Sequence, residues 1–173
     1  FGDNIALIGN GRRRTYKELT DWTNRLSWAL VDNYNVKPGN RVLIRSANNP
    51  AMVACWLAAT KVGAVVVNTM PLLRKKELSE IIDKAEISHI LCDTRLIEEV
   101  EDSGKEHSCV KFVIPFDGSA NHNSELDKVA LEKSIHFKAN KTSWDDVALL
   151  GFTSGTTGSP MDTMHFHRDL LII

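Results

Sequence analysis

Residues 41–67 read RVLIRSANNPAMVACWLAATKVGAVVV. Arg41 to Ile44 is an apolar-rich run typical of a strand, and Pro50 suits the first turn of a helix that is apolar almost all round. Gly63 ends that helix, and the β-branched run Ala64–Val67 predicts the next strand. A strand, a buried helix and a second strand in this order predict a βαβ unit of a parallel sheet.

The same alternation continues on both sides of this unit. Thr15 and Glu18 have the spacing of a capping box, and the apolar periodicity that follows predicts a helix from Tyr16 to Asn33. Further helices and strands are expected in turn at Lys76–Lys84, His89–Cys92, Thr94–Asp102 and Val110–Ile114. We therefore predict an α/β fold with a mainly parallel sheet flanked by helices. Its strands Ala64–Val67, His89–Cys92 and Val110–Ile114 are expected to be parallel neighbours.

A small hairpin is expected at the amino end. The runs Ile5–Ile8 and Arg12–Thr15 flank Asn10-Gly11, which favours a tight turn because both residue types tolerate positive φ. Gly9-Asn10-Gly11 also begins like a dinucleotide-binding fingerprint, but Arg14 stands where the third glycine is needed for close helix packing. The turn is therefore the favoured interpretation.

Residues 117–143 differ in composition from the rest of the chain. Asp117–Asn123 and His136–Ser143 are polar, and Glu125–Lys133 between them fits a short helix. We expect this segment to be an internal boundary or a surface excursion within residues 1–173.

The bulk composition is that of an ordinary soluble globular protein. Of the 173 residues, 43% are hydrophobic and 25% are charged, and the net charge is −1, so no nucleic-acid partner is indicated. The basic clusters Arg12–Arg14 and Arg74–Lys76 are short, and we expect them to be solvated edges. The longest apolar stretch, Ala51–Val67, is broken by polar residues and glycine, so no membrane span is expected.

Three cysteines, Cys55, Cys92 and Cys109, form an odd set without paired spacing. This pattern favours reduced thiols, and no basic-then-apolar leader opens the chain at Phe1. We therefore expect a cytoplasmic protein.

Residues 147–160, VALLGFTSGTTGSP, place an apolar strand directly before a segment of hydroxyl residues and glycines. Because Gly155 and Gly158 can adopt positive φ, such a loop can direct several N–H groups and hydroxyls at one centre, which suits a polyphosphate. An ordinary Ser/Thr/Gly-rich loop is the alternative. The P-loop NTPase pattern is absent, because neither Gly151 nor Gly155 is followed at the required spacing by a glycine and a lysine.

The order Thr-Ser-Gly-Thr-Thr-Gly-x-Pro resembles the signature loop of the adenylate-forming enzymes, which include acyl- and aryl-CoA ligases. The resemblance extends over the whole chain, through Thr15–Leu19, Val36–Val42, Asn49-Pro50 and Lys61–Val65. Within that family, Thr69–Arg74 and Thr163–Asp169 look most like bacterial benzoate- and aminobenzoate-CoA ligases.

The resemblance implies an enzyme that uses ATP, Mg²⁺ and CoA to activate a carboxylic acid, aromatic or medium-chain, as an acyl-adenylate. The ATP phosphates would then contact the loop residues Thr153, Ser154, Gly155, Thr156, Thr157 and Gly158. Residues 1–173 would be the amino-terminal portion of the large adenylation domain and would end just after this phosphate loop. The resemblance places the catalytic lysine and the acid pocket beyond Ile173, so it assigns no catalytic residue here and implies that this portion alone is inactive.

The loop departs from the family pattern directly after Pro160. The family usually has Pro-Lys-Gly there, whereas this chain has Pro160-Met161-Asp162. Methionine adds no positive charge beside the phosphates, which predicts weakened or altered ATP binding.

Two other features have ordinary explanations that we favour. His165 and His167 stand at metal-ligand spacing on a strand, but two ligands do not make a site, and packing or capping at the next helix is the preferred role. The tryptophans at positions 22, 28, 56 and 144 are expected to pack in the core or between subdomains.

Two rival functions remain open on these residues. One is an adenylation enzyme with a different thiol acceptor, such as a carrier protein. The other is a non-catalytic nucleotide-binding module that kept the loop without its lysine.

Overall fold

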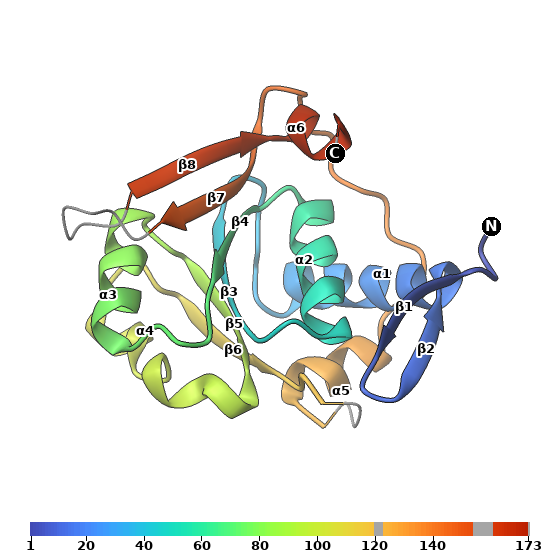
Figure 1. Ribbon diagram of the computed structural model, residues 1–173, viewed down its shortest axis with the longest axis horizontal. Coiled ribbons are helices and arrows are strands. Elements are labelled where there is room, and N and C mark those ends of the chain that lie inside the picture. The colour runs from blue at the N-terminus through green and yellow to red at the C-terminus, as the bar shows by residue number, and fades with distance from the viewer. Residues whose placement is uncertain (120–122, 154–160, 173) are drawn as a thin grey trace.

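The computed structural model describes residues 1–119, 123–153 and 161–172. Its strands are β1 (Ile5–Gly9), β2 (Arg12–Thr15), β3 (Arg41–Arg45), β4 (Val65–Thr69), β5 (His89–Asp93), β6 (Phe112–Phe116), β7 (Val147–Thr153) and β8 (Met161–Phe166). Its helices are α1 (Tyr16–Asp32), α2 (Pro50–Val62), α3 (Lys75–Lys84), η1 (Thr94–Glu99, a 3₁₀ helix), α4 (Ser103–Glu106), α5 (Glu125–Leu131) and α6 (His167–Ile172). The predicted alternation of strands and helices is confirmed (Figure 1).

The main sheet has the strand order β6-β5-β3-β4-β7-β8. The pairs from β6 to β7 are all parallel, and only β8 runs antiparallel, so the mainly parallel α/β sheet is confirmed. The prediction that β4 and β5 are neighbours is wrong, because β3 lies between them. The chain leaves β3 toward β4 on one side and then crosses back to β5 on the other, which puts β3 at the centre.

Helices cover both faces of this sheet (Figure 1). Val42 and Ile44 of β3 point into the core shared with α1 and α2, whereas Leu43 between them points into the core shared with α3. These three side chains are 0–2% exposed, as expected for a central strand buried on both faces. This explains why the strand is a continuous apolar run and not an alternating one.

Helix α2 fits tightly because its buried residues are small. Ala54, Ala58 and Ala59 are fully buried between α1 and the sheet. The helix ends at Gly63, which has a φ of 87° and is a left-handed cap. A Cβ at Gly63 would also lie 2.8 Å from Nδ2 of the Asn140 side chain, so only glycine fits this turn.

The amino-terminal hairpin is confirmed. Strands β1 and β2 are antiparallel, and Asn10 and Gly11 between them have φ values of 52° and 72°. The turn is therefore a hairpin of the predicted kind, in which both central residues adopt positive φ. Thr15 and Glu18 form the capping box that starts α1.

The predicted helix Thr94–Asp102 is wrong as a single element. The chain forms the short 3₁₀ helix η1, and α4 follows it. Leu96 has a non-helical φ of −124°, and its carbonyl accepts a hydrogen bond from Arg45 Nε at 3.2 Å. A tertiary donor thus takes a carbonyl that a continuous α-helix would use internally.

Much of the polar segment 117–143 lies along α1. Within it, Leu126 and Ala130 of α5 are almost fully buried against the helix. Farther along, the Ile135 carbonyl accepts from Asn24, and the His136 carbonyl accepts from Trp28 at 2.7 Å. These bonds hold a segment of low apolar content against the body of the protein.

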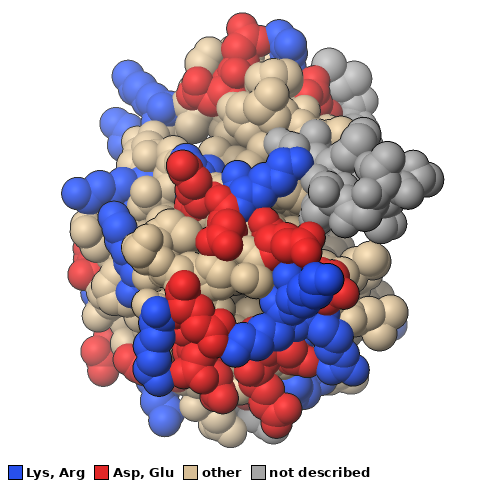
Figure 2. Space-filling view, turned by 90° about the vertical axis from the view of Figure 1, so that its left-hand side faces the viewer, with Lys and Arg blue, Asp and Glu red and all other residues tan. Residues whose placement is uncertain are grey.

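The face formed by α3, η1 and α4 carries interleaved charges (Figure 2). Arg74 pairs with Glu99 at 2.7 Å, and Lys75 pairs with Glu106 at 2.5 Å. The two basic side chains are 77% and 58% exposed, so this cluster is a solvated edge, as predicted. No helix among the described residues is long and apolar enough to cross a membrane.

All three cysteines are free thiols. Cys55 and Cys92 are buried, and burial raises the pKa of both, that of Cys92 to about 12. These two thiols therefore remain protonated and unreactive at neutral pH.

Candidate functional site

Strand β7 leads into the segment that the sequence singles out. It pairs in parallel with β4, with Val66 opposite Leu149, so its carboxyl end emerges at the same edge of the sheet as those of β3, β4 and β5. Thr153 is its last residue, and Ser154 to Gly158 lie outside the described residues. The predicted phosphate contacts of Thr153–Gly158 therefore stay a prediction.

Packing on both faces fixes the end of β7. Leu149 faces the core of α1 and α2, while Leu150 and Phe152 face the core of α3. The Lys84 ammonium at the end of α3 lies 6.0 Å from the centroid of the Phe152 ring. A firmly packed strand is a suitable base for a loop rich in glycine and small residues.

Strand β8 returns antiparallel beside β7, which the sequence did not indicate. Gly151 lies opposite Thr163, whose Oγ1 donates to the Gly151 carbonyl at 3.3 Å. A Cβ at Gly151 would lie 3.1 Å from that Oγ1, so the strands approach closely here. His165 belongs to β8, but His167 is the first residue of α6, so the two do not share one strand face. Among the described residues no group of three or more His, Cys, Asp or Glu side chains could hold a metal ion.

A buried carboxylate, Asp93, ends strand β5 at the same edge. It accepts bonds from Arg95 Nε at 2.9 Å and Nη2 at 2.6 Å, and from Ser46 Oγ at 3.4 Å. Asn49, the N-cap of α2, donates to it at 3.5 Å. The carboxylate thus joins the ends of β3 and β5 to the start of α2. No motif in the sequence pointed to this cluster.

Asp93 should make stability depend on pH. Burial opposes its ionisation, but the hydrogen bonds from Arg95 outweigh this, and the net effect lowers its pKa below the usual 3.8. Its contribution to stability is therefore complete above about pH 4 and is lost as the pH falls through the lower folded value. We expect the stability difference between wild type and Asp93→Asn to shrink as pH is lowered from 6 toward 3. Urea unfolding at several pH values measures it, and a difference that grows in acid would contradict this account.

A hollow of about 210 Å³ lies between the carboxyl ends of β3 and β4. The chain leaves β3 toward α2 on one face, and it leaves β4 toward α3 on the other. The hollow lies beside the switch point between β3 and β5, where the strand order reverses and near which open α/β sheets bind ligands. We call this hollow the switch-point crevice; it is lined by Ile44, Ser46, Asn48, Met52, Asn68, Thr69, Met70 and Pro71.

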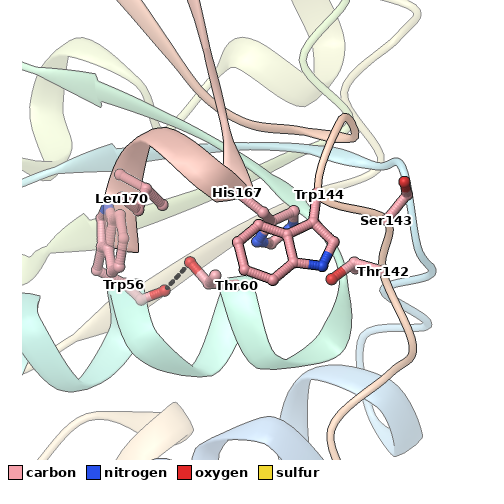
Figure 3. Close-up of a pocket in the computed structure, with 7 residues that line it drawn as sticks. All are labelled: Trp56, Thr60, Thr142, Ser143, Trp144, His167 and Leu170. Carbon is pink, nitrogen blue, oxygen red and sulfur yellow. Dashed lines mark hydrogen bonds between the residues drawn. The ribbon is translucent and has the colours of Figure 1, made fainter. Parts of the chain in front are cut away.

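A second hollow, of about 440 Å³, lies between α2, residues 142–144 and α6. Figure 3 shows Trp56 and Leu170 at one end and Trp144 near Thr60 and His167 at the other. This hollow combines two indole rings with hydroxyl and imidazole groups.

The four tryptophans do not share one role. Trp28 packs edge-on against Phe137, at 5.0 Å between ring centroids, which confirms the packing prediction for it. Trp144 is 66% exposed, so it does not pack in the core, and packing between subdomains stays a prediction for it. It stands in the irregular segment before β7, where no neighbouring element covers it within the described part of the chain.

Comparison with known proteins gives one family match. A family profile described as AMP-binding enzyme matches residues 1–172. The 3-oxocholest-4-en-26-oate–CoA ligase of Rhodococcus rhodochrous is 29% identical over 97% of this chain and 31% of its own length. The 3-hydroxybenzoate–CoA ligase of Aromatoleum sp. (strain CIB) is 27% identical over 99% of this chain and 33% of its own length. The chain therefore spans about a third of the length of these relatives.

Solved structures share the fold. The anthranilate CoA ligase AuaEII, in complex with anthranoyl-AMP, superposes with a TM-score of 0.89 at 19% identity, over 99% of this chain and 33% of its own. Apo MatB from Rhodopseudomonas palustris gives a TM-score of 0.85 at 22% identity, also over 99% and 33%. At these identities the likeness concerns the fold alone.

Proposed function

The chain belongs to the family of AMP-binding enzymes, whose profile spans residues 1–172, and from this premise we propose that the protein is an ATP-dependent carboxylic acid–CoA ligase. In the first step the carboxylate would attack the α-phosphorus of ATP, which forms an acyl-adenylate and releases pyrophosphate. In the second step the CoA thiolate would attack the acyl carbon and release AMP. That the relatives named above are CoA ligases supports this acceptor.

The observation on which this function rests is the placement of the hydroxyl- and glycine-rich segment. Parallel strand β7 ends at Thr153, at the carboxyl edge of the sheet, directly before Ser154–Gly158. We propose that Thr153–Gly158 bind the β- and γ-phosphates of ATP through hydroxyls and main-chain N–H groups. Charge stabilisation and in-line positioning are what phosphoryl and nucleotidyl transfer require from a protein.

ATP would enter with Mg²⁺ on its phosphates. No described cluster of carboxylates is placed to hold the ion by itself, which fits an ion bound chiefly by the nucleotide. We further propose that residues 1–173 are the amino-terminal portion of the large adenylation domain. Activity is expected only from a protein that also has the regions that the relatives have beyond the matched third.

The acid is proposed to be aromatic, of the benzoate or aminobenzoate class. The segments Thr69–Arg74 and Thr163–Asp169 support this class, and a medium-chain acid is the alternative. We place the enzyme in the cytoplasm, where ATP and CoA are available.

Exchange of labelled pyrophosphate into ATP by the full-length protein, with a panel of aromatic and aliphatic acids, tests the function. Acid-dependent exchange together with acyl-CoA formation is the expected result. Exchange without acyl-CoA would indicate a different thiol acceptor. ATP binding without exchange for any acid would indicate a non-catalytic nucleotide-binding module.

Met161 gives a direct test of the phosphate site. Met161→Lys in the full-length protein should tighten ATP binding or speed adenylation by up to about tenfold, which equals roughly 1.4 kcal/mol, because it adds a positive charge beside the phosphates. Met161→Gln, which adds polarity without charge, is the matched control. If lysine and glutamine behave alike, no charge is missing at this position.

A further inference from the structure

Arg45 is a charged side chain that is 0% exposed at the carboxyl end of the central strand β3. Its guanidinium donates to the carbonyls of Leu96 at 3.2 Å, Met70 at 3.3 Å, Pro71 at 3.3 Å and Leu73 at 2.9 Å. One side chain thus binds η1 and three residues of the segment between β4 and α3.

Stability alone does not account for a charge in this place. Burying a guanidinium costs several kcal/mol of desolvation, and an apolar side chain of similar volume is often as stable. Glu99 offsets part of that cost at 3.3 Å from Nη2. The pKa of Glu99 is lowered, chiefly by its hydrogen bond from Arg74 and also by Arg45, so this carboxyl group stays ionised at neutral pH.

Within the described part of the chain, the segment 70–73 has little else to hold it. Met70 and Leu72 are 62% and 83% exposed, and only Leu73 packs partly against the α3 core. One turn hydrogen bond, from Leu73 N to the Met70 carbonyl at 3.1 Å, closes the segment on itself. Its position therefore depends on the bonds that Arg45 donates to three of its four carbonyls.

This segment is one wall of the switch-point crevice. Met70 and Pro71 line it on the β4 side, and Ser46 and Asn48 line it on the β3 side. None of the described lining residues is charged. The side-chain amides of Asn48 and Asn68 form no hydrogen bond with the described residues, so each keeps donors and an acceptor free for a ligand.

We propose that Arg45 is a positioning residue that fixes segment 70–73 as a wall of the switch-point crevice, and that this crevice receives an uncharged, hydrogen-bonding part of a substrate. The second half rests on the proposed ligase function. The ATP phosphates are already assigned to Thr153–Gly158, so we assign the ligand part in the crevice to the acid or to the thiol substrate.

The positioning role is tested in the 173-residue chain by amide hydrogen exchange. In Arg45→Met the Leu73 amide, which donates to the Met70 carbonyl, should exchange at least about tenfold faster, while the amides of β3 and β5 stay protected. Arg45→Lys keeps the charge and roughly the length of the side chain but loses the planar guanidinium that donates to several carbonyls at once. It should give a smaller increase in the exchange rate. If Arg45→Met does not fold, Arg45→Lys decides the question. Unchanged exchange in a folded variant overturns the proposal.

Arg41→Met is the matched control. Arg41 lies at the amino end of the same strand, where it donates to the Ala85 carbonyl and pairs with Glu86, far from the crevice. Its loss should leave exchange of segment 70–73 unchanged. Equal effects of the two variants would mean that general destabilisation, not Arg45, governs the segment.

Kinetics of the full-length protein test the substrate part. Arg45→Met should raise the KM of either the acid or CoA at least about fivefold, with kcat within about twofold and the KM of ATP unchanged. The substrate whose KM rises is the one that enters the crevice. Unchanged KM values, or a loss of kcat alone, would overturn this part. A wild-type protein without ligase activity would refute the proposed function and this part together, while the exchange result would still decide the positioning role.

Discussion

Replacing Gly155 by valine in the full-length protein is expected to reduce pyrophosphate exchange at least about a hundredfold. This is the loss typical of removing one hydrogen-bond donor that stabilises the charge of a transition state. The sequence places Gly155 in the middle of the hydroxyl-rich segment that follows β7. A β-branched residue there would oppose positive φ and would fill the space through which a phosphate approaches the main chain. The fold should persist, because the strands on both sides are held by their own pairing and packing.

Thr157→Ala is the matched comparison in the same loop. It removes one hydroxyl and leaves the backbone free, so the expected cost is about 1–3 kcal/mol if that hydroxyl donates to the phosphates. Both variants must have the melting temperature of the wild type before their rates of pyrophosphate exchange are compared. A Gly155→Val enzyme with the wild-type exchange rate would show that the loop is only a turn, and the proposed function would lose its main support.

Gly118→Ala is expected to destabilise the chain by about 1–3 kcal/mol, the usual range for forcing an extra methyl group into a packed site. A Cβ at Gly118 would lie 1.9 Å from Asp93 Oδ2 and 2.7 Å from Arg95 Nη2. The carboxylate cannot move aside at low cost, because it is buried and held by Arg95, Ser46 and Asn49. Urea unfolding of the 173-residue chain measures the loss.

Two further variants make this result specific. Gly104→Ala is the control, because a Cβ at Gly104 meets nothing within 4 Å and the residue lies in helix α4, where alanine is preferred. In an Asp93→Ser background, which removes the clashing oxygen, the cost of Gly118→Ala should fall below about 1 kcal/mol, as coupling between neighbours requires. A cost that is the same in both backgrounds would place the strain elsewhere.

The sequence by itself determined the local elements and the family. Hydrophobic periodicity, the Thr15 capping box, the Asn10-Gly11 turn and the Gly63 cap each depend on residues close together in the chain, so their signals are complete within a short window. The hydroxyl- and glycine-rich motif after β7 is likewise contiguous. It identified the family and named the candidate phosphate ligands before any contact was known.

Only the tertiary structure decided which elements meet. The central place of β3, the return of β8 beside β7 and the break of the predicted helix at Leu96 depend on partners far along the chain. The same is true of the Asp93 cluster and of Arg45. In the sequence they are single charged residues at the ends of apolar runs, and such residues are most often solvated. Their burial and bonding arise because parallel strands bring their carboxyl ends to one edge, where loops from separate segments supply the donors and carbonyls that a buried charge requires.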